Sequence, residues 1–134
     1  MNPAQIAKDS ESSHQIALFA MCALNMKRYP ELKWLHAIPN GGLRDKITAG
    51  KLKAEGVKSG VSDISMPVKR SIYSGLYIEM KKPSMKAVKE TSKGGASDDQ
   101  IEFAQFVIKQ GFFFKFCYSW EEAWYWIETY LNMK

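Results

Sequence analysis

Apolar and polar side chains alternate in two stretches near the middle of the chain, and this pattern predicts two strands. In residues 76–81 (LYIEMK) every second side chain is apolar, as in a strand with one face in the core. Glu79 and Lys81 then share the opposite face of that strand. Residues 63–68 form the second strand, and the short connection 69–75 predicts an antiparallel hairpin.

Helical spacing and helix-boundary residues predict four helices around this hairpin. The first has one apolar face, and the second is weakened by Gly50 and stops at Gly56. Capping-box sequences begin the last two helices at Ser97 and Ser119. The helices span residues 10–28, 44–55, 97–110 and 119–132. The apolar face of the first is expected to comprise Ile16, Phe19, Ala20, Ala23 and Leu24.

The remaining segments complete an α/β fold. Residues 34–38 and 112–118 are strand candidates, residues 82–96 are a long basic loop, and residues 1–9 are a loose start. The order α-β-α-β-β-α-β-α predicts a mixed β-sheet flanked by helices, with residues 1–134 forming a single domain.

Composition narrows the class of protein. The chain has 134 residues, of which 46% are hydrophobic and 25% charged, which is typical of a soluble globular protein. No apolar run is long enough for a membrane span and no signal peptide is recognisable, so we expect a cytoplasmic, intracellular protein. Cys22 and Cys117 have no metal-ligand spacing and are expected to be buried, reduced thiols.

The net charge of +5 and the isoelectric point near 9.2 are consistent with a nucleic-acid partner, although lysine-rich surfaces also serve solubility alone. Most of the basic residues lie between Arg44 and Lys93. The residues expected to contact a phosphate backbone are Arg44, Lys46, Lys58, Lys82, Lys86, Lys89 and Lys93.

The hairpin brings together residues suited to phosphodiester hydrolysis. Antiparallel pairing sets the start of one strand beside the end of the other, so Asp63 and Glu79 become neighbours. Two adjacent carboxylates repel unless a cation lies between them, and Mg²⁺ prefers such oxygen ligands. Lys81 lies on the same face as Glu79, where it could orient the attacking water or stabilise charge on the phosphate.

An ordered set of motifs resembles the PD-(D/E)xK nuclease superfamily, and more narrowly its virus-type replication-repair nuclease (VRR-NUC) domain. The set comprises G-V-S-D at residues 60–63, E-M-K at 79–81 and S-D-D-Q at 97–100, and the resemblance extends over residues 11–131. It implies a Mg²⁺-dependent DNA endonuclease, with Mn²⁺ as a substitute ion. Its substrate would be structured DNA, such as four-way junctions or flaps, in viral or phage replication or repair.

The resemblance also assigns roles to individual residues. Asp63 and Glu79 would be metal ligands, the Met80 carbonyl a third, and Lys81 the catalytic lysine. Gln100 would help position the water or phosphate, and Glu11 would complete the acidic cluster. One departure is Ser62, which stands where the superfamily has proline before the aspartate. Because proline there ligates nothing, the departure affects local geometry and leaves the chemistry in place.

Simpler alternatives remain open for several of these assignments. Glu11 could do no more than stabilise the positive end of its helix, and Gln100 could do no more than complete its capping box. His14 and His36 lack metal-ligand spacing and read as ordinary structural residues. A non-catalytic nucleic-acid-binding module with the nuclease fold is the rival function. An oligonucleotide-binding barrel is disfavoured because the pattern contains at least three clear helices.

The final helix bears on assembly. Resolving a four-way junction requires two symmetric cuts, so the resemblance favours a homodimer. Trp126 and Tyr130 lie beside the apolar stripe of this helix and are expected near the contact between subunits. The stripe itself, which should pack on the sheet, comprises Trp120, Ala123, Trp124, Ile127 and Leu131.

Overall fold

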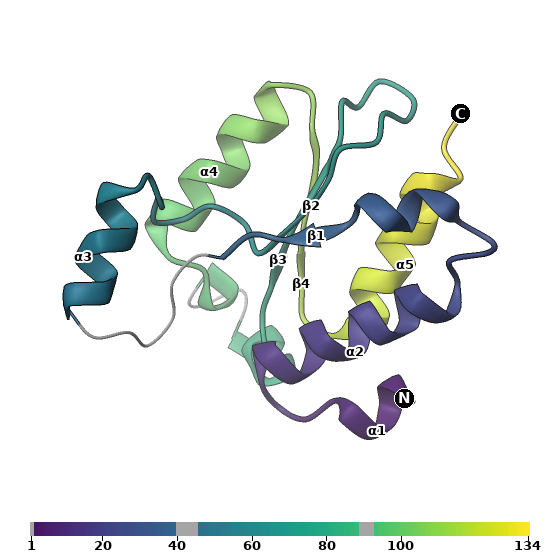
Figure 1. The fold of residues 1–134 in the computed structure, drawn as a ribbon, viewed down its shortest axis with the longest axis horizontal. Coiled ribbons are helices and arrows are strands. Elements are labelled where there is room, and N and C mark those ends of the chain that lie inside the picture. The colour runs from purple at the N-terminus through teal and green to yellow at the C-terminus, as the bar shows by residue number, and fades with distance from the viewer. Residues whose placement is uncertain (1, 40–45, 89–92) are drawn as a thin grey trace.

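The computed structural model describes residues 2–39, 46–88 and 93–134, and a four-stranded mixed sheet forms its centre (Figure 1). The first two pairings of the sheet are antiparallel, and β3 and β4 are parallel. The predicted hairpin and mixed sheet are therefore confirmed. In spatial order the strands are β1 (His36–Ala37), β2 (Ile64–Met66), β3 (Leu76–Met80) and β4 (Phe113–Cys117).

β1 is shorter than the predicted strand 34–38 because a 3-10 helix, η1 (Pro30–Trp34), precedes it. Pro30 at the start of η1 has a fixed φ that suits this turn. Part of the predicted basic loop is likewise folded into two 3-10 helices, η2 (Pro83–Val88) and η3 (Lys93–Gly95).

The helices agree with the predicted order, with one addition. The loose start contains a short helix, which begins with proline at its first turn and is capped by the Asn2 side chain. The capping boxes place the starts of the last two helices correctly. The helices are α1 (Pro3–Ile6), α2 (Glu11–Leu24), α3 (Lys46–Ala54), α4 (Asp98–Lys109) and α5 (Trp120–Leu131).

The helices cover both faces of the sheet. α2 and α5 pack side by side on one face, α4 lies on the other, and α3 stands farther out beyond α4 (Figure 1). The core between the sheet and the α2–α5 layer includes Leu18, Ile78 and Ile127, all fully buried. The predicted stripe of α5 faces this core, with Trp120 only partly buried at its start.

The predicted apolar face of α2 is wrong in its orientation. Ile16 and Leu24 are 50% and 67% exposed, whereas His14, Leu18 and Cys22 face the core. The Nδ1 atom of His14 accepts a hydrogen bond from the Trp120 backbone N–H at 2.9 Å. This bond joins α2 to the start of α5. Apolar residues surround most of α2, so periodicity alone does not select the buried side.

The prediction that Tyr130 lies near a subunit contact is also wrong, because Tyr130 is a core residue. Its side chain is fully buried, and its hydroxyl donates a hydrogen bond to the Val68 carbonyl at 2.5 Å. Trp126 is half-buried, and the Lys115 ammonium lies 4.0 Å from the centre of one of its rings. Tyr130 therefore belongs to the protein's own core, whereas the place of Trp126 near a subunit contact stays a prediction.

Two further observations concern the chain as a whole. Cys22 and Cys117 are free and buried, as predicted, and burial raises the pKa of the Cys22 thiol to about 12. Within the three described segments, no helix combines the length and apolar character needed to cross a bilayer.

Candidate active site

The register of the hairpin sets Asp63 opposite Glu79. Ile64 pairs with Ile78 in the antiparallel ladder, and one step further along the strands leads to Asp63 and Glu79. The Asp63 backbone is held by the Ile38 N–H, which donates to its carbonyl at 2.7 Å. Its carboxylate accepts a hydrogen bond from the Met80 N–H at 2.7 Å. The neighbouring carboxylates expected from the sequence are therefore present.

Glu79 is a buried carboxyl group, with 2% of its surface exposed. Burial, a hydrogen bond with the Asp63 carboxyl group and the charge of Asp63 raise the pKa of Glu79 to about 10, while Lys81 opposes the rise. At neutral pH the pair therefore retains a proton when no cation is bound. A pair of neighbouring acids of which one is buried is typical of a functional site.

Lys81 follows directly after β3 and is held by two other elements. Its Nζ donates a hydrogen bond to Gln100 Oε1 at 2.7 Å and lies 3.9 Å from Glu11 Oε1. The side chain is only 7% exposed. The ammonium group is thus fixed in place near the two carboxyl groups.

Gln100 completes the predicted capping box and also binds Lys81, and its role in positioning water or phosphate stays a prediction. Its Oε1 accepts from the Ser97 N–H at 3.0 Å, and its own N–H donates to Ser97 Oγ at 3.2 Å, which completes the capping box of α4. The same Oε1 atom accepts from Lys81. The start of α4 therefore orients the lysine.

Glu11 likewise combines two roles. It is the first residue of α2, where a carboxylate favours the positive helix end, and it is the acidic neighbour of Lys81. Burial raises the pKa of Glu11, and the charge of Lys81 opposes this. Among the described residues, no three His, Cys, Asp or Glu side chains are arranged as a metal-binding group. Direct ligation by Glu11 and by the Met80 carbonyl stays a prediction.

An open cavity of about 380 Å³ reaches the side of this cluster formed by Lys81 and Glu11. Lys81 and Glu11 line it, together with Lys82 and Met85 at the start of the predicted basic loop. A ligand entering the cavity would meet the Lys81 side chain.

The expected phosphate-binding residues differ in their surroundings. Lys46 and Lys58 are exposed, and Lys82 is half-buried in the cavity wall. Lys86 forms an ion pair with Glu122 at 2.9 Å, which offsets part of its charge. Arg44, Lys89 and the Lys93 side chain lie outside the described residues.

Sequence reasoning missed two features beside the site. Gly60 has a φ of +88°, and a Cβ there would lie 2.5 Å from the Asp99 carbonyl oxygen, so only glycine allows this approach to α4. Ser59 Oγ donates to the Asp99 carboxylate at 2.7 Å. Lys51 and Lys53 belong to the basic stretch between Arg44 and Lys93 but not to the expected phosphate contacts, and they extend the basic surface along α3, which has no buried residue. A lysine-rich helix without an apolar stripe is the signal that identifies them.

Comparison with known proteins supports the fold. No protein-family model matches the chain, and no curated protein sequence matches it. A solved structure described as a VRR_NUC domain protein matches with a TM-score of 0.71 over 95% of this chain and 92% of that chain. The two sequences are 21% identical, so the likeness is one of fold. This chain therefore has the mixed-sheet fold of a VRR-NUC domain protein, as its motifs predict.

Proposed function

We propose that this chain is a nuclease of the VRR-NUC family that hydrolyses phosphodiester bonds in DNA with the aid of a divalent metal ion. The observation that supports this most strongly is the meeting of Asp63, Glu79 and Lys81 at one end of the β2–β3 hairpin. The fold shared with a VRR_NUC domain protein points in the same direction.

The donor atoms fit a hard divalent cation. Asp63 and Glu79 offer carboxylate oxygens from the two arms of the hairpin, and these are the ligands that Mg²⁺ prefers. We assign these two residues, with the Met80 carbonyl, to hold Mg²⁺ or Mn²⁺. When bound, the ion supplies Lewis-acid stabilisation of the phosphate and lowers the pKa of the attacking water.

The protein's own residues orient the reaction. The Lys81 ammonium, fixed by Gln100 and Glu11, is placed to donate hydrogen bonds to a phosphate oxygen and to stabilise the negative charge that develops there. Because Gln100 is itself held in the capping box, Lys81 needs little rearrangement when substrate binds.

We further propose that the substrate is branched or structured DNA, such as a four-way junction or a flap, and that the protein acts in replication or repair of viral or phage DNA. The exposed lysines of α3 and of the segment that follows it, among them Lys46 and Lys58, support binding of a phosphate backbone. A non-catalytic binding module is the alternative, and the presence of all three residues of the cluster argues against it.

A panel of labelled DNAs tests this proposal. Duplex, flap, single-stranded and four-way junction DNAs of related sequence are incubated with the protein and Mg²⁺, Mn²⁺ or EDTA, and the products are resolved by length. We expect metal-dependent internal cuts, made fastest in the branched DNAs. Binding without cleavage of any DNA would favour the non-catalytic module, and faster cutting of plain duplex would refute the substrate assignment.

A further inference from the structure

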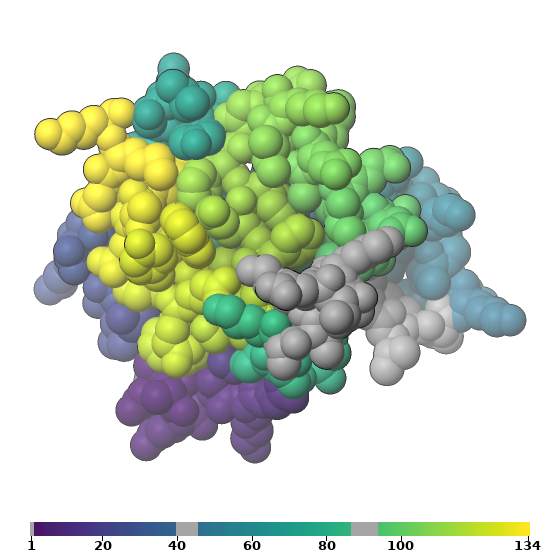
Figure 2. Space-filling model, turned by 180° about the vertical axis from the view of Figure 1, so that it is seen from behind, coloured from purple at the N-terminus to yellow at the C-terminus, as the bar shows by residue number. Residues whose placement is uncertain are grey.

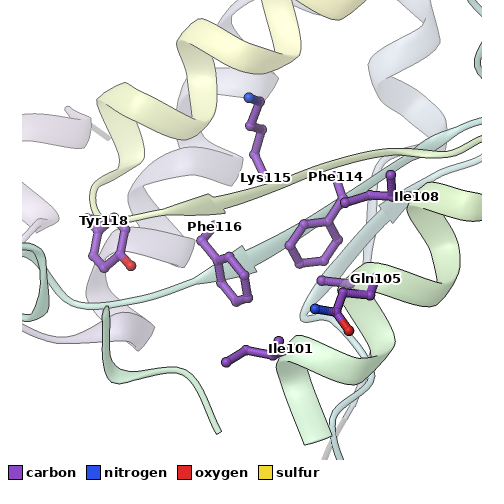
Figure 3. Close-up of a pocket in the computed structure, with 8 residues that line it drawn as sticks. Ile101, Gln105, Ile108, Phe114, Lys115, Phe116 and Tyr118 are labelled. Carbon is purple, nitrogen blue, oxygen red and sulfur yellow. The ribbon is translucent and has the colours of Figure 1, made fainter. Parts of the chain in front are cut away.

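A second feature of the molecule lies along β4, the edge strand of the sheet. β4 pairs with β3 alone among the described strands, and it lies open to view between α4 and α5 in Figure 2. Beside it is a groove of about 620 Å³ between β4 and α4. Figure 3 shows Phe114 and Phe116 directed toward α4, with Lys115 directed to the opposite side.

The strand register connects this groove to the candidate active site. Phe116 pairs with Glu79 and Phe114 pairs with Tyr77 in the parallel ladder, so these side chains share one face of the sheet. Adjacent strands lie about 4.8 Å apart. At the α4 side, Ile101 in the groove wall directly follows Gln100, which binds Lys81. The groove is thus a lateral continuation of the face that carries Glu79.

The lining of the groove indicates the kind of ligand it fits. Phe114 and Phe116 are half-buried, and Ile108 on the opposite wall is 55% exposed. The one charged residue among those that line it, Lys115, has its ammonium over the Trp126 ring on the other face of the sheet. Gln105 contributes an exposed amide to the rim. Largely apolar walls with an amide and, from Tyr118, a phenol hydroxyl suit a flat, uncharged group with a polar edge.

We propose that this groove binds an unpaired nucleobase of the DNA, close to the bond that is cut, by stacking on Phe114 or Phe116. The inference rests on the proposed nuclease function and deepens it. Aromatic side chains on a strand bind bases in this way without reading sequence. Because a base within a duplex is already stacked on its neighbours, the groove favours substrates with unpaired nucleotides, such as flaps.

Removing single bases tests the stacking directly. Binding of a labelled flap DNA is measured in EDTA, so that no cleavage occurs, and an abasic nucleotide is moved through the unpaired strand. For the unaltered protein we expect one position where base loss weakens binding about 5- to 150-fold, the range for loss of one stacked base. In a Phe114→Leu/Phe116→Leu variant the abasic and intact DNAs should bind equally.

Matched variants separate stacking from folding and from other occupants of the groove. Phe106→Leu, on an α4 residue outside the groove that is 59% exposed, should retain the abasic effect, and Phe114→Tyr/Phe116→Tyr should also retain it. An equal abasic penalty in the leucine and parent proteins would overturn the inference. So would a leucine variant that changes only the sedimentation coefficient, because the groove would then be a contact between copies. A parent protein that cuts no DNA would instead defeat the proposed function.

Discussion

At the scale of single residues, the burial of Glu79 has a consequence for stability. Its pKa is about 10 in the folded protein against an ordinary value of 4.5, so between these pH values the folded state holds a proton that the unfolded state has lost. Folding then takes up a proton, and the free energy of unfolding falls as pH rises through this window. The carboxyl group therefore destabilises the metal-free protein at neutral and alkaline pH.

Replacing Glu79 by glutamine should remove this effect. We expect Glu79→Gln to raise the melting temperature of the metal-free protein at about pH 8 and to flatten its decline between about pH 5 and 9. Thermal melting in EDTA across this range measures both. Glu102→Gln, at an exposed position of α4, is the control and should follow the parent. Parallel declines for Glu79→Gln and the parent would show that Glu79 does not carry the effect.

Gln100 and Ser97 allow the structural and functional parts of one capping box to be separated. Ser97→Ala removes the cap and should cost about 0.5–2 kcal/mol of stability with little change in kcat. Gln100→Ala also frees Lys81, so we expect kcat to fall about 10- to 100-fold. Urea unfolding and cleavage at saturating DNA measure the two effects. Equal values of kcat for Ser97→Ala and Gln100→Ala would show that Gln100 only caps α4 and does not act through Lys81.

At the scale of elements, α3 is an exposed helix with a basic surface. Lys46, Lys51 and Lys53 form no ion pair with any described residue. The segment that follows α3 is fixed to the start of α4 through Gly60 and the Ser59–Asp99 hydrogen bond, close to Gln100. The segment after α3 is therefore attached beside the candidate site, and we expect α3 to contact DNA that enters the site.

Neutralising the lysines of α3 should weaken DNA binding through lost phosphate contacts. If all three contact duplex phosphates, glutamine at positions 46, 51 and 53 lowers the slope of log K against log salt by about 2.7. Fluorescence anisotropy over a salt series measures this slope. The control carries glutamine at Lys27, Lys33 and Lys134, three exposed lysines, and loses the same net charge. Equal reductions in both proteins would contradict a specific role for α3.

The elements also show what the sequence can and cannot predict. The alternation in β3 and the serines at the starts of α4 and α5 are local signals, and the structure confirms them. The adjacency of Asp63 and Glu79 follows from hairpin pairing, which is also local. In contrast, the buried face of α2 depends on its contact with α5, far along the chain. The close approach of Gly60 to Asp99 and the groove beside β4 depend on α4 in the same way.

At the scale of the whole molecule, the candidate site is assembled from the β2–β3 hairpin and the starts of two helices on opposite faces of the sheet. α2 supplies Glu11 and α4 supplies Gln100, and both reach Lys81 at the end of β3. Substitutions that alter the packing of α2 or α4 should therefore affect cleavage, even at positions that do not contact the substrate.

Assembly is a second property at this scale. Because one chain offers one cluster, paired cuts in a junction require two copies, and we expect a two-fold homodimer. The contact must lie away from Tyr130, which is buried. Sedimentation equilibrium at micromolar concentration should give twice the chain mass of 15.3 kDa. A monomer that still makes paired junction cuts would contradict this expectation.

Lys81 is the member of the Asp63, Glu79 and Lys81 cluster whose loss gives the sharpest test of DNA cleavage, because both carboxylates then stay in place. Single-turnover cleavage of a labelled branched DNA with Mg²⁺ is compared for the parent, Lys81→Ala and Lys27→Ala. Lys27 lies beyond the other end of α2, roughly 20 Å along the helix from Glu11. We expect Lys81→Ala to lower the rate by about 100- to 1,000-fold while Lys27→Ala cleaves like the parent. Undiminished cleavage by Lys81→Ala would show that this cluster is not the site of DNA cleavage.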